Sequence, residues 1–102
     1  MKDIQILPAV LQDIAEAAAW YDEDCYAGLG DRFIATFYNY FPIIRENGSI
    51  YRKAYLDFRK VIIQPFPYSL FYRLHTDTWI IALVIHAARR PSLERRILRE
   101  RK

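Results

Sequence analysis

Apolar residues recur through the first half of the chain at steps of three and four, the spacing that places side chains on one face of a helix. Pro8 suits the first turn of such a helix. Residues 3–7 alternate between apolar and polar, as in a short strand. We therefore predict a strand and then a helix that ends at the glycine break of residues 28–30. The apolar face of this helix comprises Leu11, Ile14, Ala18, Tyr21 and Cys25.

A second helix is predicted after the glycine break, with Asp31 in its first turn or at its cap. Pro42 removes one helical hydrogen bond and clashes with the preceding turn, so we expect a kink or an early stop near residues 38–41. Asn47 and Gly48 are predicted to end the helical region with a left-handed cap. The apolar face is an aromatic stripe formed by Phe33, Phe37, Tyr40, Phe41 and Ile44.

The second half of the chain is typical of strands. Residues 55–63 are rich in β-branched and aromatic side chains, and Pro65 ends this run. Residues 68–74 alternate between two faces, and the polar turn of residues 75–78 predicts a hairpin partner. That partner, residues 79–86, is apolar on both faces, which indicates a central strand covered on both sides.

The order β-α-α-β-β-β, followed by a short basic helix, predicts an α+β fold. In this fold a helical hairpin packs on a three- to four-stranded antiparallel sheet. A length of 102 residues suits a single domain that spans residues 1–102.

Charge is distributed unevenly along the chain, although the net charge is only +3. Residues 1–31 contain seven acids and one lysine, whereas residues 32–102 contain fourteen Lys or Arg and five acids. The basic excess is densest in residues 89–102, with seven bases and two acids. Two interpretations stay open: a surface for a polyanionic or acidic partner, or a solvated helix kept soluble by its arginines.

Composition and motifs exclude several classes of protein. A hydrophobic fraction of 53%, with three Gly and five Pro, argues against disorder and low-complexity repeats. No apolar run reaches the roughly 18 residues that cross a bilayer, and the start lacks the apolar core of a signal peptide. We therefore expect a cytoplasmic protein with no membrane partner. One cysteine, two distant histidines and no nucleotide motif predict neither a metal nor a cofactor.

The strand-rich half concentrates basic and aromatic side chains. If Arg59 and Arg73 lie on neighbouring strands and share a face, they form a positive patch with His86 and Arg89 at its rim. Such a patch could bind phosphates, and His86 is the one group suited to exchange a proton near neutral pH. The structural alternative is that the arginines extend along a half-exposed strand and that His86 caps backbone groups.

Aromatic residues on the helices suggest a partner surface. Tyr21, Tyr38 and Tyr40 cannot all belong to the core, and exposed aromatic side chains in numbers mark surfaces that bind other proteins. The alternative interpretation is a simple abundance of aromatic residues.

Several segments together resemble the RelE/ParE toxin superfamily, in particular its ParE-like plasmid stabilisation branch. The most specific pair is Phe-Pro-Tyr-Ser-Leu-Phe-Tyr-Arg at residues 66–73 and the ending His86-x-x-Arg-x-Pro91. The resemblance runs from Ile4 to about Pro91. Supporting matches lie at residues 17–21, 28–33 and 57–60.

This resemblance implies a toxin of a type II toxin–antitoxin pair, a small basic protein neutralised by the acidic, flexible segment of a cognate antitoxin. ParE-type members act on DNA gyrase, whereas RelE-type members cleave ribosome-bound mRNA with side chains on the sheet. Carried over by position, Arg59, Arg73, His86 and Arg89 occupy places typical of the family and would be catalytic only in a RelE-like chain.

Three functions stay open. We favour a ParE-like toxin that acts by binding, because the sheet lacks a dense run of Lys and Arg and a clear general base. The alternatives are a RelE-like, metal-free endoribonuclease and an inactive relative kept as an antitoxin-binding partner. Arg90 stands where the branch usually has Asp, and Pro42 interrupts a helix that relatives usually keep whole. We expect the antitoxin to contact the helix pair and the sheet edge.

Overall fold

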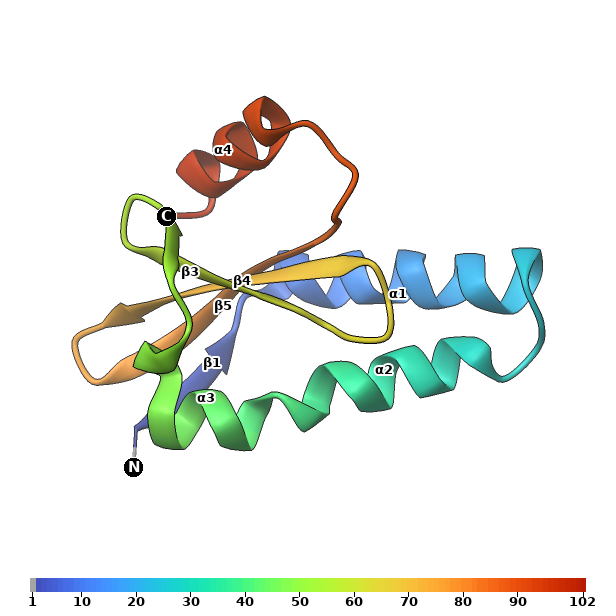
Figure 1. Cartoon of the computed structure of the whole chain (residues 1–102), viewed down its shortest axis with the longest axis horizontal. Helices are drawn as coiled ribbons and strands as arrows, with labels where there is room; N and C mark the ends of the chain where they lie inside the picture. Colours follow the sequence, from blue (N-terminus) through green and yellow to red (C-terminus); the bar gives the residue numbers. More distant parts are fainter. Residues whose placement is uncertain (1) are drawn as a thin grey trace.

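The computed structural model describes residues 2–102, and it arranges the chain as a five-stranded sheet with helices on both faces (Figure 1). The strands are β1 (Asp3–Ile6), β2 (Lys53–Tyr55), β3 (Phe58–Ile62), β4 (Tyr68–His75) and β5 (Thr78–His86). The helices are α1 (Pro8–Asp24), α2 (Leu29–Asn39), α3 (Phe41–Asn47), the 3-10 turn η1 (Gly48–Ile50) and α4 (Pro91–Glu100).

The sheet has the order β1-β5-β4-β3-β2. β1 pairs with β5 in parallel, and the other neighbours are antiparallel. The double burial predicted for residues 79–86 is confirmed, and β5 has a strand on each side as far as Ile81. The predicted α+β class is also confirmed, but the sheet has five strands. One reason is that the segment predicted as a single strand at 55–63 turns back at Leu56, whose φ of 52° is left-handed.

The two faces of the sheet are covered by different helices. α1, α2 and α3 pack on one face, and α4 crosses the other (Figure 1). The larger core lies under α1 to α3 and joins their apolar side chains to alternate residues of β3, β4 and β5. The smaller core lies under α4 and consists of Phe58, Phe71, Ala82, Leu83, Ile85 and Leu98.

The first helix buries a face slightly rotated from the predicted one. Ile14, Ala18 and Tyr21 are buried as predicted, but Leu11 is 49% exposed and Cys25 is exposed. Val10 and Ala17 are buried as well, because α1 lies against both the sheet and α2. The predicted helix end is confirmed, since Gly28 takes the left-handed φ of 95° that lets the chain turn.

The second predicted helix is interrupted near Pro42, as expected. α2 ends at Asn39, and α3 begins at Phe41 with the proline in its first turn. The expected left-handed cap at Gly48 is wrong, because this glycine has a φ of −62° and begins η1. Glycine is required there for space, since a Cβ would lie 2.6 Å from the Trp79 ring.

Candidate functional site

The strand β5 is longer than its parallel neighbour, and this difference leaves part of its edge without a strand. β1 pairs with β5 only as far as Ile81, whose carbonyl also accepts a hydrogen bond from the Leu7 N–H at 3.1 Å. Within the described residues no strand pairs with residues 82–86 on this side. Two side chains form hydrogen bonds with the backbone groups of this edge instead. The Val84 N–H donates to Asp13 Oδ2 at 3.2 Å, and the Ala82 carbonyl accepts from Arg101 Nη1 at 3.0 Å.

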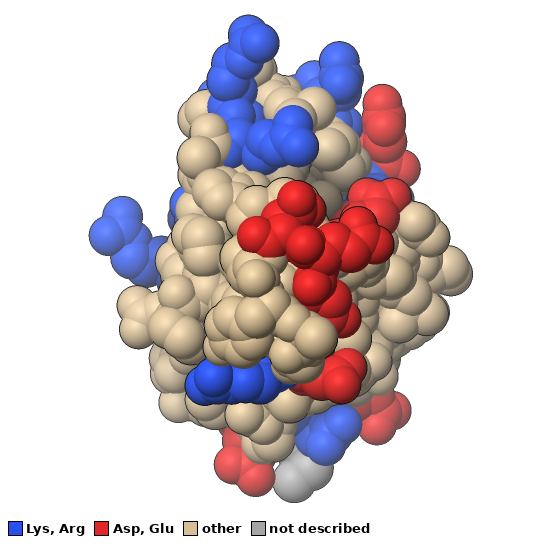
Figure 2. Space-filling view, turned by 90° about the vertical axis from the view of Figure 1, so that its right-hand side faces the viewer, with Lys and Arg blue, Asp and Glu red and all other residues tan. Residues whose placement is uncertain are grey.

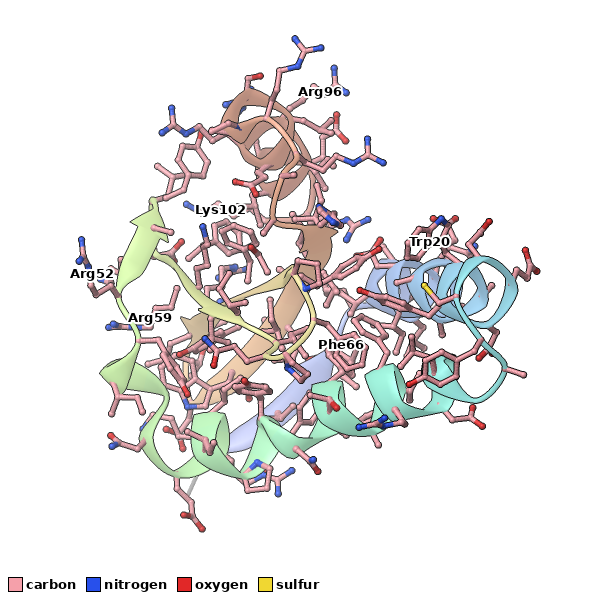
Figure 3. The ribbon with its side chains drawn as sticks, turned by 45° about the vertical axis from the view of Figure 1, so that its right-hand side comes forward. Trp20, Arg52, Arg59, Phe66, Arg96 and Lys102 are labelled. Carbon is pink, nitrogen blue, oxygen red and sulfur yellow. The ribbon has the colours of Figure 1, made fainter. Side chains whose placement is uncertain are left out.

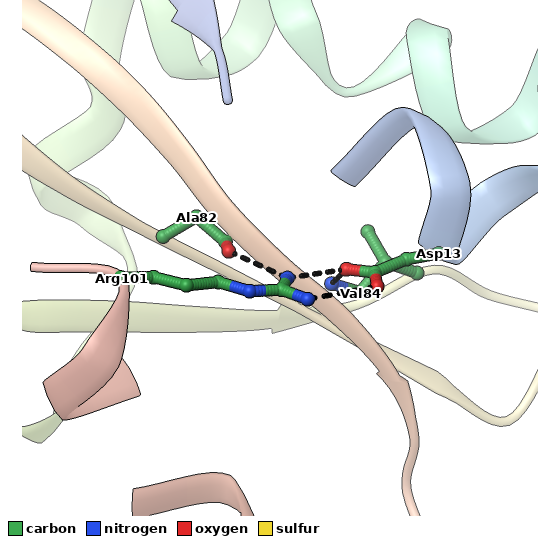
Figure 4. A network of polar contacts seen from close by, with 4 residues as sticks. All are labelled: Asp13, Ala82, Val84 and Arg101. Atoms are coloured by element: carbon green, nitrogen blue, oxygen red, sulfur yellow. Dashed lines mark hydrogen bonds and ion pairs between the residues drawn. The ribbon is translucent and has the colours of Figure 1, made fainter. Parts of the chain in front are cut away.

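Asp13 and Arg101 form a two-pronged ion pair at this edge (Figure 4). Arg101 Nη1 donates to Asp13 Oδ2 at 2.6 Å, and Arg101 Nη2 donates to Asp13 Oδ1 at 3.1 Å. Their side chains are only 15–20% exposed, so few water molecules compete with the pair. The pair therefore ties the residue after α4 to α1 and to the edge of β5.

A groove of about 370 Å³ follows the open edge of β5 between α1 and α4. Val84 and Ile85 form its floor, Ala17 and Trp20 its α1 wall, and Leu93 and Ile97 its α4 wall. The Trp20 side chain is 51% exposed and lies on the side of α1 that faces α4 (Figure 3). The groove thus combines a strand edge without a neighbouring strand, walls that mix apolar side chains with charged ones such as Glu16, and an exposed aromatic ring.

Three polar residues lie together where the groove meets the end of β5. Tyr68, His86 and Arg89 all line this end of the groove. The Tyr68 ring packs edge-on against the His86 imidazole, with 5.3 Å between the two ring centroids. His86 Nδ1 accepts a hydrogen bond from the Ala88 N–H at 3.0 Å, so the imidazole also supports the local turn. Burial raises the pKa of Tyr68, and Arg89 partly opposes this shift, so the phenol is protonated at neutral pH.

Arg59 and Arg73 lie on neighbouring strands but on opposite faces of the sheet. Arg59 is opposite Tyr72 in the register, on the face covered by α1 to α3. Its Nη1 donates to the carbonyls of Ser49 at 3.2 Å and Tyr51 at 2.7 Å, so the guanidinium supports the turn around η1. Arg73 lies on the other face, with its guanidinium 6.0 Å from the centre of the Phe58 ring.

The positive patch considered from the sequence is therefore not formed. His86 is opposite Tyr68 in the register, at the end of β4 away from Arg73, so Arg59, Arg73 and His86 do not converge. The face that carries Arg73 also carries the buried Phe58, Phe71 and Leu83, and α4 covers it. The expectation that the sheet presents its cations outward is wrong, because α4 has its own apolar side and packs on this face.

The three candidate tyrosines have different environments. Tyr21 is 6% exposed and packs between Phe33 and Phe66, and burial raises its pKa. Tyr40 is partly buried, and its hydroxyl accepts a hydrogen bond from the Gln64 N–H at 3.1 Å. Only Tyr38, 41% exposed on α2, has a ring available for a partner.

The groove was not predicted from the sequence. Its signals were the brevity of the first strand relative to the strand at 79–86 and the apolar positions 93, 97 and 98 within the basic segment. Residues 2–102 hold no cluster of three His, Cys, Asp or Glu side chains suited to a metal ion. None of the helices described combines the length and the apolar character needed to cross a membrane.

The family model described as "ParE toxin of type II toxin-antitoxin system, parDE" matches residues 4–91. A solved chain from the chromosomal ParDE toxin–antitoxin system of P. aeruginosa is similar with a TM-score of 0.75 at 9% identity, covering 84% of this chain and 96% of that chain. No curated protein matches the sequence. Because the family model spans well over half of the sequence, the chain belongs to the ParE toxin family.

Proposed function

We propose that this chain is the toxin of a type II toxin–antitoxin pair, which inhibits an essential target by binding it and is neutralised by a cognate antitoxin. DNA gyrase is the candidate target. Membership of the ParE family supports the toxin role. The observation that favours binding over catalysis is that Arg59, Arg73 and His86 do not converge on the sheet, whose face under α4 is packed with apolar side chains.

The groove between α1 and α4 is the proposed antitoxin site. An extended segment can add a strand to an open sheet edge, because main-chain hydrogen bonds supply affinity and side-chain pockets supply specificity. Here no strand pairs with the edge beyond Ile81, and an incoming strand would displace Asp13 and Arg101 from the backbone groups that they occupy there. Trp20 offers an exposed ring to the incoming side chains. Tyr38 is the proposed contact on the helix pair, where the antitoxin would continue.

Titration calorimetry with the product of the adjacent small gene tests this site. We expect Trp20→Ala to weaken binding at least tenfold, about 1.4 kcal/mol, because a half-exposed ring at a groove is a typical interface anchor. Tyr26→Ala is the matched control, since this tyrosine is 55% exposed outside the groove. Equal affinities of the wild type and Trp20→Ala would remove the groove from the interface.

The same titration with Tyr38→Asp tests the helix-pair contact. A carboxylate cannot replace the apolar ring in an interface, so we expect weaker antitoxin binding with unchanged folding, because the side chain is 41% exposed. Unchanged affinity would assign the whole interface to the groove.

The second candidate is a RelE-like, metal-free endoribonuclease. The observation that favours it is the grouping of Tyr68, His86 and Arg89 at one end of the groove. In that reaction His86 would take the proton of a 2′-hydroxyl and the protonated Tyr68 would supply one to the leaving oxygen. Primer extension on ribosome-bound mRNA during growth arrest tests this candidate, since an absence of new cleavage ends would eliminate it.

A further inference from the structure

The outward side of α4 and the loop before it carry arginines around a second hollow. This hollow has a volume of about 580 Å³, and its lining includes Arg89, Arg90, Ser92, Arg96 and Arg99. No acidic side chain lines it. Figure 2 shows Lys and Arg gathered at the upper end of the molecule, where α4 lies, with most acidic side chains below them and some beside them on the right.

The arginines around the hollow have no ionic partner within the described residues, whereas other arginines nearby are paired with a carboxylate or an aromatic ring. Arg101 is paired with Asp13, and Arg95 lies 5.5 Å from the centre of the Tyr55 ring. Arg99 Nη1 donates to the Tyr55 hydroxyl at 3.0 Å, which leaves its charge unbalanced. Arg89, Arg90 and Arg96 form no side-chain hydrogen bond or ion pair within residues 2–102, and Arg96 points into solvent (Figure 3).

Four unbalanced guanidinium groups around one hollow repel one another, and an anionic ligand relieves this repulsion. Guanidinium groups present planar pairs of N–H donors that match phosphate oxygens, so a phosphate-bearing ligand suits them better than a point charge would. Glu94 provides no counter-charge here, because it lines a different hollow on the sheet side of α4 with Lys60.

The apolar part of the hollow is limited to Ala88 and the partly buried Leu93, and this limit indicates the kind of polyanion. The large exposed hydrophobic residues, from Leu11 to Leu74, all precede β5, and none lies on α4. A membrane-binding helix or a protein interface buries aromatic or aliphatic side chains together with its cations. Binding through cations alone is the mode by which proteins contact nucleic-acid phosphates without reading bases.

We infer that the arginine face of α4, formed by Arg89, Arg90, Arg96 and Arg99, binds the phosphodiester backbone of nucleic acid independently of base sequence. This face lies outside the antitoxin groove except at Arg89, which lines both hollows. The inference goes beyond the proposed function and does not rest on it.

Fluorescence anisotropy with labelled duplexes of about 20 base pairs, one of DNA and one of RNA, tests the inference at several salt concentrations. We expect the double variant Arg90→Glu/Arg96→Glu to bind at least tenfold more weakly than the wild type. Its plot of log affinity against log salt should be shallower by about two, because two phosphate contacts are lost. The DNA and RNA arms show which backbone is preferred.

The matched control is Arg52→Glu/Lys53→Glu, which changes net charge equally at two exposed residues of the opposite edge of the sheet. We expect this control to retain most of the affinity. Circular dichroism and antitoxin titration should give wild-type results for Arg90→Glu/Arg96→Glu, which separates this surface from the groove.

Three results would overturn the inference. The first is no binding of either duplex by the wild type at low salt. The second is an equal loss of affinity in the control, which would assign the effect to net charge. The third is displacement of the labelled duplex by a poly-glutamate peptide of equal charge as efficiently as by unlabelled duplex.

Discussion

At the scale of single residues, Gly48 shows how close packing and hydrogen bonding fix one turn. The chain passes so near the Trp79 ring that no side chain fits at this position. The Gly48 carbonyl accepts a hydrogen bond from the buried Tyr72 hydroxyl. Burial raises the pKa of Tyr72, so the hydroxyl keeps the proton that it donates.

Gly48→Ala is expected to lower the free energy of unfolding by about 1–3 kcal/mol, because the added methyl group forces the Trp79 ring or the turn to move. Urea denaturation followed by tryptophan fluorescence measures the loss. Ser49→Ala is the control, since Ser49 is exposed and should change stability by less than about 0.5 kcal/mol. Equal stability of the wild type and Gly48→Ala would contradict the packing described here.

Glu94 makes stability depend on pH. Burial raises the pKa of this carboxyl above its ordinary value of 4.5, and Lys60 and Arg95 only partly oppose the shift. The protonated group therefore stabilises the fold below pH 4.5, and this contribution is lost as pH rises through the folded-state pKa.

Glu94→Gln should consequently raise the melting temperature relative to the wild type at pH 7 and lose this advantage at pH 4. Thermal unfolding at the two pH values measures the difference. Glu100→Gln, at an exposed position on the same helix, should show no such pH-dependent gain. A stabilisation by Glu94→Gln that is larger at pH 4 than at pH 7 would reverse the sign argued here.

The neighbours of individual residues were harder to predict from the sequence than the elements or the fold. The sequence suggested a left-handed cap at Gly48 because the adjacent Asn-Gly pair is typical of one, but the constraint comes from Trp79, which is distant in the chain. Arg59 was a candidate functional charge, yet its partners are the carbonyls of Ser49 and Tyr51. Long-range neighbours of this kind leave no local pattern.

At the scale of elements, apolar packing and a few polar contacts hold α4 against the sheet. Leu98 is fully buried against the sheet, and Leu93 and Ile97 pack beside it. Polar contacts lie at the periphery, where Arg99 bonds to Tyr55 and Arg101 pairs with Asp13. The ion pair is the least exposed of the three salt bridges found in residues 2–102.

Arg101→Met is expected to lower the free energy of unfolding by roughly 2 kcal/mol, because it leaves a mostly buried Asp13 carboxylate without its cation. Denaturant unfolding measures this loss, and hydrogen exchange should become faster in α4. Lys102→Met is the matched control, since its 3.9 Å pair with Asp57 is exposed and should contribute less than about 0.5 kcal/mol. Similar effects of the two variants would show that the pair does not hold α4.

Helices and strands could be predicted from the sequence where a single spacing of apolar residues continued without interruption. The helix after Pro8, the break near Pro42 and the hairpin of β4 and β5 follow from spacing and turn residues. The split between β2 and β3 was missed because its turn begins at Leu56, an apolar residue with no turn preference. The place of α4 on the second sheet face was also missed, although the helix itself was expected.

At the scale of the whole molecule, the groove arises from a mismatch between two strands. β1 has four residues and β5 has nine, so the sheet edge is closed along only part of its length. The walls come from opposite ends of the sequence, since α1 precedes the sheet and α4 follows it. Fold class was predictable from element order and from the family resemblance, but the site was not, because it depends on which elements become neighbours in space.

Growth after induced expression tests the toxin role most directly, with viable cells counted for the chain alone and for the chain with the product of the adjacent small gene. A toxin is expected to stop growth when expressed alone, and co-expression of its antitoxin is expected to restore growth. The Trp20→Ala variant is expected to stop growth as well, but the partner should restore growth less completely. Unimpaired growth during expression of a folded, soluble chain would contradict the toxin role and favour an inactive relative.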